Sequence, residues 1–147
     1  MRTIPLIAAA ILAGCATPTP YDDIADKAYW GTKWVDQSGN DRMKFGCSKE
    51  GDCDDRALCA ACRLVQAGAK PSEITVVVEG WDTHNKLNHM SIEYKGYCLM
   101  GYGANAYPGQ CKHRLADSKM TVSRTPLPAY LKKMNAEMNC EGFEHGF

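Results

Sequence analysis

The stretch GDCDDRALCAACRLVQAG, from Gly51 to Gly68, has the pattern of an amphipathic helix with a cysteine at its start. Its apolar residues recur at the spacing of one helix face, at Ala57, Leu58, Ala61, Leu64 and Val65. Asp52 is a good N-cap residue, and Gly68 followed by Pro71 is typical of a helix end. The stretch therefore predicts a helix that begins at Cys53.

A thiol in this position has a chemical consequence. The first turn of a helix presents unpaired backbone N–H groups, whose positive field favours the thiolate, the nucleophilic form of cysteine. Cys53 is therefore a candidate nucleophile, and its backbone N–H is a candidate donor to an oxyanion.

The N-terminus has the features of an export signal. Arg2 precedes an apolar stretch, residues 4–12, that is too short to span a bilayer and ends in small residues. Residues 12–15, Leu-Ala-Gly-Cys, resemble the bacterial lipobox. The resemblance implies that residues 1–14 are a signal peptide removed in the mature protein, and that Cys15 carries lipid. An ordinary signal peptide cut elsewhere is the alternative interpretation.

Further expectations of location and organisation follow from this resemblance. Ala16 after the lipidated cysteine is the pattern of lipoproteins sent to the outer membrane, so we expect the bacterial cell envelope, at the periplasmic face of the outer membrane. Residues 15–23 contain two prolines and are predicted to be a lipidated tether that attaches the protein to the membrane. Residues 24–147 are predicted to form one domain.

Composition excludes some partner classes. The 147 residues include 17 basic and 17 acidic side chains, so the formal net charge is zero and no basic footprint for nucleic acid is present. Hydrophobic residues make up 45% of the chain, which is enough for one core. We expect a monomer.

The cysteine count leaves one thiol over. Eight cysteines are present, and lipid on Cys15 would leave seven in an oxidising compartment. We predict that Cys53 stays free and that up to three disulfides join the other six: Cys47, Cys59, Cys62, Cys98, Cys111 and Cys140. Cys59 and Cys62 lie three apart on one helix, too far to pair with each other, so we expect each to bridge to another element, for example to Cys47 or Cys140.

The rest of the chain reads as α+β. A helix is predicted within residues 24–35, with Trp30 and Trp34 on one core-facing side. Residues 73–80, EITVVVEG, form a β-branched strand, and residues 89–103 alternate around Lys95-Gly96 as a hairpin. Met120 begins another predicted strand, and Pro126 begins a closing helix that extends to Asn139.

Two segments together carry a family resemblance. GDCDDRAL opening a helix, followed by a strand and then HMSIEY opening a hairpin, resembles the transglutaminase-like cysteine proteinases of bacteria. The resemblance covers about residues 51–105 and implies a transglutaminase-like, papain-related core, with the nucleophile helix packed on a small antiparallel sheet. It also implies that Cys53 is the nucleophile and His89 the base.

The third catalytic position departs from the family pattern. The family places an aspartate on the strand after the histidine, where this chain has CLMGYGAN without an acid. We assign the orienting role to Asn105, by analogy with the asparagine of papain-like enzymes. The hydroxyl of Tyr102 is the alternative.

Metal binding is a further expectation from the resemblance. In one group of the family, acids around the nucleophile bind calcium, and Asp52 and Asp55 match those positions. The alternative is that the acids only cap the helix and complement its dipole. No other cofactor is expected. A zinc site is disfavoured because the spacing fits no finger pattern among its potential ligands: Cys59, Cys62, His84, His89 and His113.

These observations predict an envelope-anchored cysteine peptidase or amidase that hydrolyses a peptide-type amide by acyl transfer, with a protein or peptide of the envelope as substrate. The alternative is a non-catalytic, disulfide-rich lipoprotein that binds an envelope protein or the cell wall on the same scaffold. A thiol–disulfide exchanger using Cys59 and Cys62 is a third hypothesis.

Overall fold

A computed structural model describes residues 18–35, 46–81, 89–101, 103–112 and 120–140 of the chain. The predicted signal peptide, residues 1–14, and Cys15 lie outside these residues. The described elements follow one another along the chain in the order α1 (Asp22–Trp30), β1 (Lys33–Trp34), β2 (Glu50–Gly51), α2 (Cys53–Gln66), the 3-10 helix η1 (Pro71–Glu73), β3 (Ile74–Trp81), β4 (His89–Tyr94), β5 (Tyr97–Leu99), β6 (Tyr107–Pro108), β7 (Met120–Pro126) and α3 (Leu127–Met134).

The main sheet has five strands in the order β6-β5-β4-β3-β7, and all neighbours are antiparallel. The α+β class predicted from the sequence is confirmed, as are the interior strand β3 and the hairpin β4–β5. Lys95 and Gly96 form the two-residue turn of this hairpin with φ of 47° and 80°, and Tyr94 pairs with Tyr97. Successive positive φ angles are typical of the type I′ turn that favours glycine.

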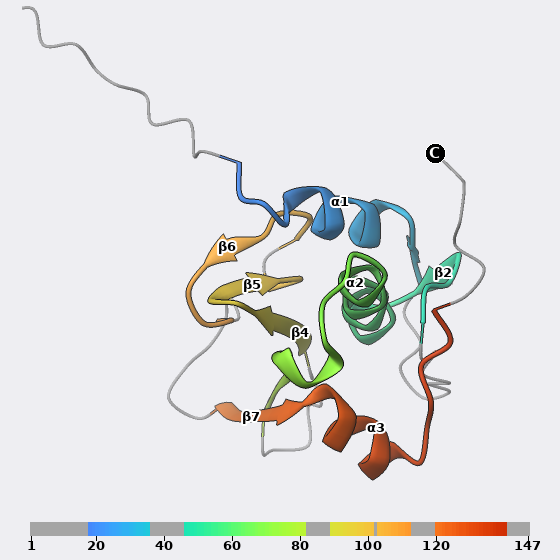
Figure 1. Cartoon of the computed structure of the whole chain (residues 1–147), viewed down its shortest axis with the longest axis vertical. Coiled ribbons are helices and arrows are strands. Elements are labelled where there is room, and N and C mark those ends of the chain that lie inside the picture. Colours follow the sequence, from blue (N-terminus) through green and yellow to red (C-terminus); the bar gives the residue numbers. More distant parts are fainter. Residues whose placement is uncertain (1–17, 36–45, 82–88, 102, 113–119, 141–147) are drawn as a thin grey trace, which may run out of the picture.

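Helix α2 lies at the centre of the fold, between α1 and strand β4 (Figure 1). Its apolar face packs against one face of the sheet because aliphatic side chains recur every 3.6 residues on the helix and every second residue on the strands, and so form one apolar face on each. The shared core is formed by Leu58, Ala61 and Leu64 of the helix with Val76, Met90 and Ile92 of the sheet.

Three disulfides staple this core, and the sequence prediction of how α2 uses its cysteines is confirmed. Cys59 bonds to Cys47, and Cys62 bonds to Cys140. A third disulfide joins Cys98 on β5 to Cys111 in the segment after β6. The two cysteines of α2 therefore tie the helix to the loop before it and to the segment after α3.

The first helix is shorter than predicted, and the assignment of its tryptophans to the core is wrong. Helix α1 ends at Trp30, and Trp34 lies in strand β1, so the two residues do not share a helix face. Trp30 is 71% exposed and Trp34 is 53% exposed, whereas Ala25 and Ala28 are the buried residues of α1. Small alanines face the core here because α1 packs closely on α2.

The closing helix also ends early. Helix α3 stops at Met134 because Asn135 takes a left-handed conformation, with φ of 50°, and its N–H bonds to the carbonyls of Leu131 and Lys132. Asparagine tolerates this conformation and commonly ends a helix in this way. Leu127 and Tyr130 are buried, whereas Met134 is 41% exposed.

No helix within the described ranges combines the length and apolar character needed to cross a bilayer.

Candidate active site

Cys53 occupies the first position of α2, as predicted, and its side chain is half-buried. It is the one cysteine of the described residues that forms no disulfide. Asp52 is the N-cap residue but makes no side-chain capping hydrogen bond. The thiol therefore lies in the field of the helix start, where the nucleophilic thiolate is favoured.

The chain entering α2 is held by a small parallel sheet. Strand β2 pairs with β1 in the register Lys33 with Glu50 and Trp34 with Gly51. Arg56, in the first turn of α2, donates two hydrogen bonds to the carbonyl oxygen of Thr32, from Nε at 3.2 Å and from Nη2 at 2.8 Å. These contacts fix the start of α2 to the segment between α1 and β1.

Aromatic rings complete the surroundings of Arg56. Its guanidinium lies 4.1 Å from the ring centroid of Tyr29 and 5.1 Å from that of Trp34. Cation–π contacts of this kind stabilise a desolvated charge, and Arg56 is only 9% exposed. Trp34 therefore contacts a buried arginine although it is not a core residue.

Gly51 allows a close approach at the same place. A Cβ atom on Gly51 would overlap the Cβ and carboxylate of Asp55, whose side chain is fully buried. A glycine is therefore required two residues before the thiol, for packing rather than for an unusual φ. Close packing against Asp55 therefore explains the glycine of the Gly-Asp-Cys motif.

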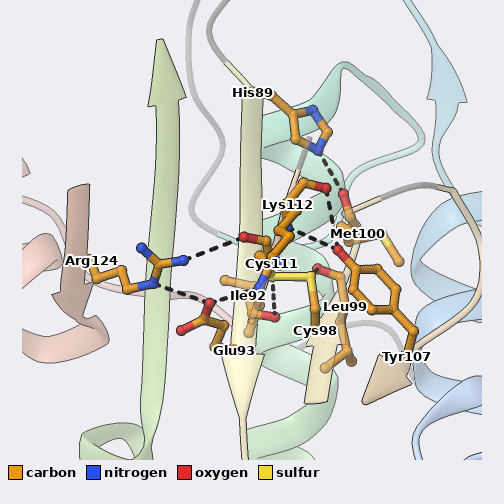
Figure 2. The surroundings of a disulfide bond; sticks show 10 residues. All are labelled: His89, Ile92, Glu93, Cys98, Leu99, Met100, Tyr107, Cys111, Lys112 and Arg124. Atoms are coloured by element: carbon orange, nitrogen blue, oxygen red, sulfur yellow. Dashed lines mark hydrogen bonds and ion pairs between the residues drawn. A yellow bond between two sulfur atoms is a disulfide. The ribbon is translucent and has the colours of Figure 1, made fainter. Parts of the chain in front are cut away.

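His89 begins β4, and its ring nitrogen Nε2 lies 2.8 Å from the carbonyl oxygen of Met100 (Figure 2). A carbonyl only accepts hydrogen bonds, so Nε2 carries a proton and donates it to this contact. In the neutral ring, Nδ1 is then the unprotonated nitrogen, the one that can act as a base. Met100 has a left-handed backbone, with φ of 66°, at the end of β5.

The topology brings the starts of α2 and β4 to the same end of the domain. After α2, residues 67–73 form a short connection to β3, which runs back along the helix. Strand β4 is antiparallel to β3, so it reverses direction again and runs the same way as α2. It also packs against α2. The 14 residues of α2 and the 6 of β4 also span similar lengths, roughly 20 Å each. Cys53 and His89 thus begin two packed elements of matching length, but Met90 and Ile92 are the residues of β4 that face α2, so the side chain of His89 projects from the other face of the sheet.

Asn105, the predicted orienting residue, is exposed. The partner shown for His89 Nε2 is the backbone of Met100, so the role of Asn105 stays a prediction. Tyr102 lies outside the described residues. The contact of His89 with the backbone carbonyl of Met100 was not predicted, because every residue type carries a backbone carbonyl and the sequence does not show which one is used.

Asp52, Cys53 and Asp54 form a group that could hold a metal ion, with their ligand atoms all within 4.8 Å of one another. Asp54 is only 6% exposed, and both of its carboxylate oxygens are buried without a hydrogen-bond partner among the described residues. An uncompensated buried carboxylate is costly, and a cation would satisfy it. Two carboxylates suit calcium, whereas the thiolate suits softer metals.

The calcium prediction paired Asp52 with Asp55. In the structure Asp54 is the acid that joins Asp52 in the possible ligand group, while Asp55 packs against Gly51. Asp52 and Asp54 therefore fit a calcium ion best, and the calcium site itself stays a prediction.

The other sequence hypotheses meet different geometry. Cys59 and Cys62 each bond to a distant cysteine, so neither is available as a redox pair or as a zinc ligand in this oxidised form. A pocket of about 320 Å³ includes Glu73, Lys95 and Gln110, at the turn end of the hairpin. This pocket lies at the opposite end of β4 from His89 and is not part of the site.

Comparison with known proteins adds no identity to this arrangement. The chain matches no protein-family model, and no curated protein is significantly similar to it in sequence. The chemistry must therefore be argued from the site. A half-buried thiol at a helix start and an imidazole with a fixed tautomer are the components of nucleophilic acyl transfer.

We expect Arg56→Lys to lower the free energy of unfolding by about 1–3 kcal/mol, because a lysine cannot donate two fixed hydrogen bonds to Thr32 while stacking on Tyr29. Urea unfolding followed by circular dichroism measures the change. Arg63→Lys on the same helix is the matched control, since Arg63 Nε makes no hydrogen bond among the described residues. Equal losses in the two variants would contradict this account of the helix start.

Calcium is tested through stability. If Asp52 and Asp54 hold the ion, calcium at a hundredfold excess over its Kd should raise the free energy of unfolding by about 2.7 kcal/mol over the value in chelator. Asp54→Asn should lose this gain, and Asp23→Asn, an exposed acid of α1, should keep it. A wild-type protein whose unfolding is unchanged by calcium would refute the site.

Proposed function

We propose that this protein is a cysteine peptidase or amidase that hydrolyses a peptide-type amide by acyl transfer between Cys53 and water, with His89 as base and acid. The observation that carries the proposal is that Cys53, at the first position of α2, forms no disulfide, whereas the other described cysteines are all bridged. An odd cysteine in an exported protein indicates either a bond to another molecule or a reactive thiol, and the helix start favours the second.

The contacts of His89 support a specific proton path. Nε2–H is held by the carbonyl of Met100, so the proton of the Cys53 thiol passes to Nδ1. The thiolate sulfur attacks the carbonyl carbon of the substrate, and a C–S bond forms. The C–N bond then breaks as Nδ1 returns the proton to the leaving amine. Water then gives a proton to Nδ1 and attacks the carbonyl carbon of the thioester; the C–S bond breaks, the carboxylic acid leaves, and Nδ1 returns the proton to the sulfur of Cys53.

The same proposal includes the transglutaminase-like core. The supporting features are the nucleophile helix α2 packed on an antiparallel sheet and the chain order of helix, strand and histidine-bearing hairpin. The carbonyl of Met100 supplies the contact to the imidazole that the family's aspartate would supply. A carbonyl fixes the ring but carries no full charge, so it stabilises the imidazolium less than a carboxylate does.

Lipid on Cys15 would place the enzyme at the periplasmic face of the outer membrane, where its substrate would be a protein or peptide of the envelope. Calcium on Asp52 and Asp54 would supply positive charge beside the thiolate and would order the helix start. No amine-binding site is evident in the described residues, so water is the proposed acceptor.

Hydrolysis of a quenched-fluorescent peptide library tests the proposal. Cys53→Ala and Cys53→Ser should abolish turnover, and His89→Ala should lower kcat/KM by about 10²–10⁴. Gln110→Ala, on the surface at the far end of the hairpin, should have no effect. A peptidyl vinyl sulfone should label the wild-type protein at Cys53 only.

Folded wild-type protein that neither cleaves the library nor reacts with the vinyl sulfone would contradict the proposal. The non-catalytic binding lipoprotein would then be the better hypothesis, and two exposed tryptophans, Trp30 and Trp34, would be its candidate contact residues.

A further inference from the structure

The start of α2 brings three metal-ligating side chains together. One ligand atom from each of Asp52, Cys53 and Asp54 lies within 4.8 Å of the other two. The group consists of one sulfur and two carboxylate oxygens. The calcium prediction uses the carboxylates alone, because calcium takes oxygen ligands. The sulfur of Cys53 gives the same group a second metal chemistry, which the proposed hydrolysis does not use.

Asp54 is the residue that points to a bound cation. It is only 6% exposed, and neither of its carboxylate oxygens has a hydrogen-bond partner among the described residues. Arg56, the nearest basic residue in the sequence, directs two guanidinium nitrogens to the carbonyl of Thr32 instead. The field of the helix start favours an acid here but does not replace a hydrogen-bond partner. A buried carboxylate without a partner is costly, and coordination of a metal ion would remove this cost.

We propose that Asp52, Cys53 and Asp54 form a site for a divalent cation of the zinc class, bound through the thiolate sulfur and one oxygen of each carboxylate. On binding, the S–H bond breaks, its proton leaves to solvent, and a sulfur lone pair goes to the metal. A coordinated sulfur does not attack a carbonyl, so the cation holds the proposed nucleophile inactive until it leaves. The metal site does not depend on the proposed peptidase activity, but its regulatory effect rests on that activity.

Ligand type and charge favour zinc over calcium at the complete group. Thiolate ligands select softer ions such as zinc, whereas calcium takes oxygen. Zinc bonds of about 2.0–2.3 Å in a tetrahedron put the ligand atoms roughly 3.5 Å apart, so these side chains need to close by about 1 Å. Three negative ligands around a doubly charged ion leave one negative charge, which suits the positive field at the start of α2.

The number of ligands makes the site reversible. A structural zinc site has four protein ligands, whereas a site with three leaves the fourth position to water. The described residues supply three, and the other cysteines of α2, Cys59 and Cys62, are in disulfides and do not complete the set. The ion can therefore exchange with solution, as regulation requires.

Protection of the thiol tests the inference without a known substrate. In the full chain carrying Cys15→Ser, Cys53 is alkylated with iodoacetamide with and without added zinc. At a hundredfold excess of free zinc over its Kd, about 1% of the thiol stays uncoordinated, so the rate should fall about a hundredfold. Chelator should restore the rate. Calcium at the same concentration should leave the rate unchanged, because calcium does not take the sulfur.

Asp54→Asn is the informative variant. It keeps the shape of the side chain and removes an uncompensated charge, so it is expected to fold. Loss of this ligand should weaken zinc binding at least tenfold, since even outer-shell partners of a metal are worth about 10–100-fold. Asp23→Asn, an exposed acid of α1, is the matched control and should bind zinc as the wild type does. Each variant is compared with its own rate in chelator.

Cobalt(II) gives a second measurement, because it occupies zinc sites and absorbs light. A sulfur ligand adds a charge-transfer band to its spectrum, and Cys53→Ser should lack this band. If Asp54→Asn does not fold, the cobalt spectrum decides instead. A band in the wild type that is missing from Cys53→Ser is the expected result, and a wild-type spectrum without the band overturns the inference.

The outcomes separate the two proposals. An alkylation rate that zinc leaves unchanged, equal protection by calcium, or undiminished zinc binding by Asp54→Asn overturns the inference. If the same protein still cleaves the peptide library, the proposed function stands. Protection by zinc in a protein that cleaves no peptide retains the metal site and overturns the proposed function.

Discussion

The covalent attachment of α2 is the constraint on which the rest of the structure depends. Cys59 ties the helix to the loop that precedes it, and Cys62, one turn later, ties it to the segment after α3. These bonds hold the central helix against both ends of the domain. They also bridge the cysteines nearest to Cys53 in the sequence, so these cannot form a disulfide with it at the helix start.

Local packing also holds the start of α2 in place. The β1–β2 pair, the close contact between Gly51 and Asp55, and the Arg56 bonds to Thr32 all fix the backbone within a few residues of Cys53. A nucleophile needs a fixed position to react efficiently, because geometry held before the reaction reduces the entropic part of the barrier. The chain holds Cys53, the proposed nucleophile, with a two-stranded sheet and one buried arginine.

Polar groups of the sheet surround the candidate base, His89. The hairpin places the carbonyl of Met100 against His89, and the neighbouring strand places Glu79 opposite it. Neither group is an aspartate on the strand after the histidine. The contact that orients the ring of His89 comes in this chain from a backbone carbonyl.

The sequence predicts correctly the elements whose signals are local. The start of α2, strand β3 and the Lys95-Gly96 turn follow from periodicity and turn chemistry, and the bridging of Cys59 and Cys62 to other elements follows from helix geometry. The exposure of Trp30 was not predictable because it depends on where α1 ends. Helix α3 was predicted too long, although Asn135 was a visible stop signal. An acid in the apolar strand β3 was visible as well, but its opposition to His89 depends on register.

The most direct test of the account is a thiol map of the protein without reduction. The full chain carrying Cys15→Ser is alkylated in the native and the denatured state, digested, and read by mass spectrometry. The account predicts one labelled cysteine in both states, Cys53, with Cys47–Cys59, Cys62–Cys140 and Cys98–Cys111 recovered as bridged peptides. Finding Cys53 inside a disulfide would contradict it, because a bridged sulfur cannot act as the nucleophile.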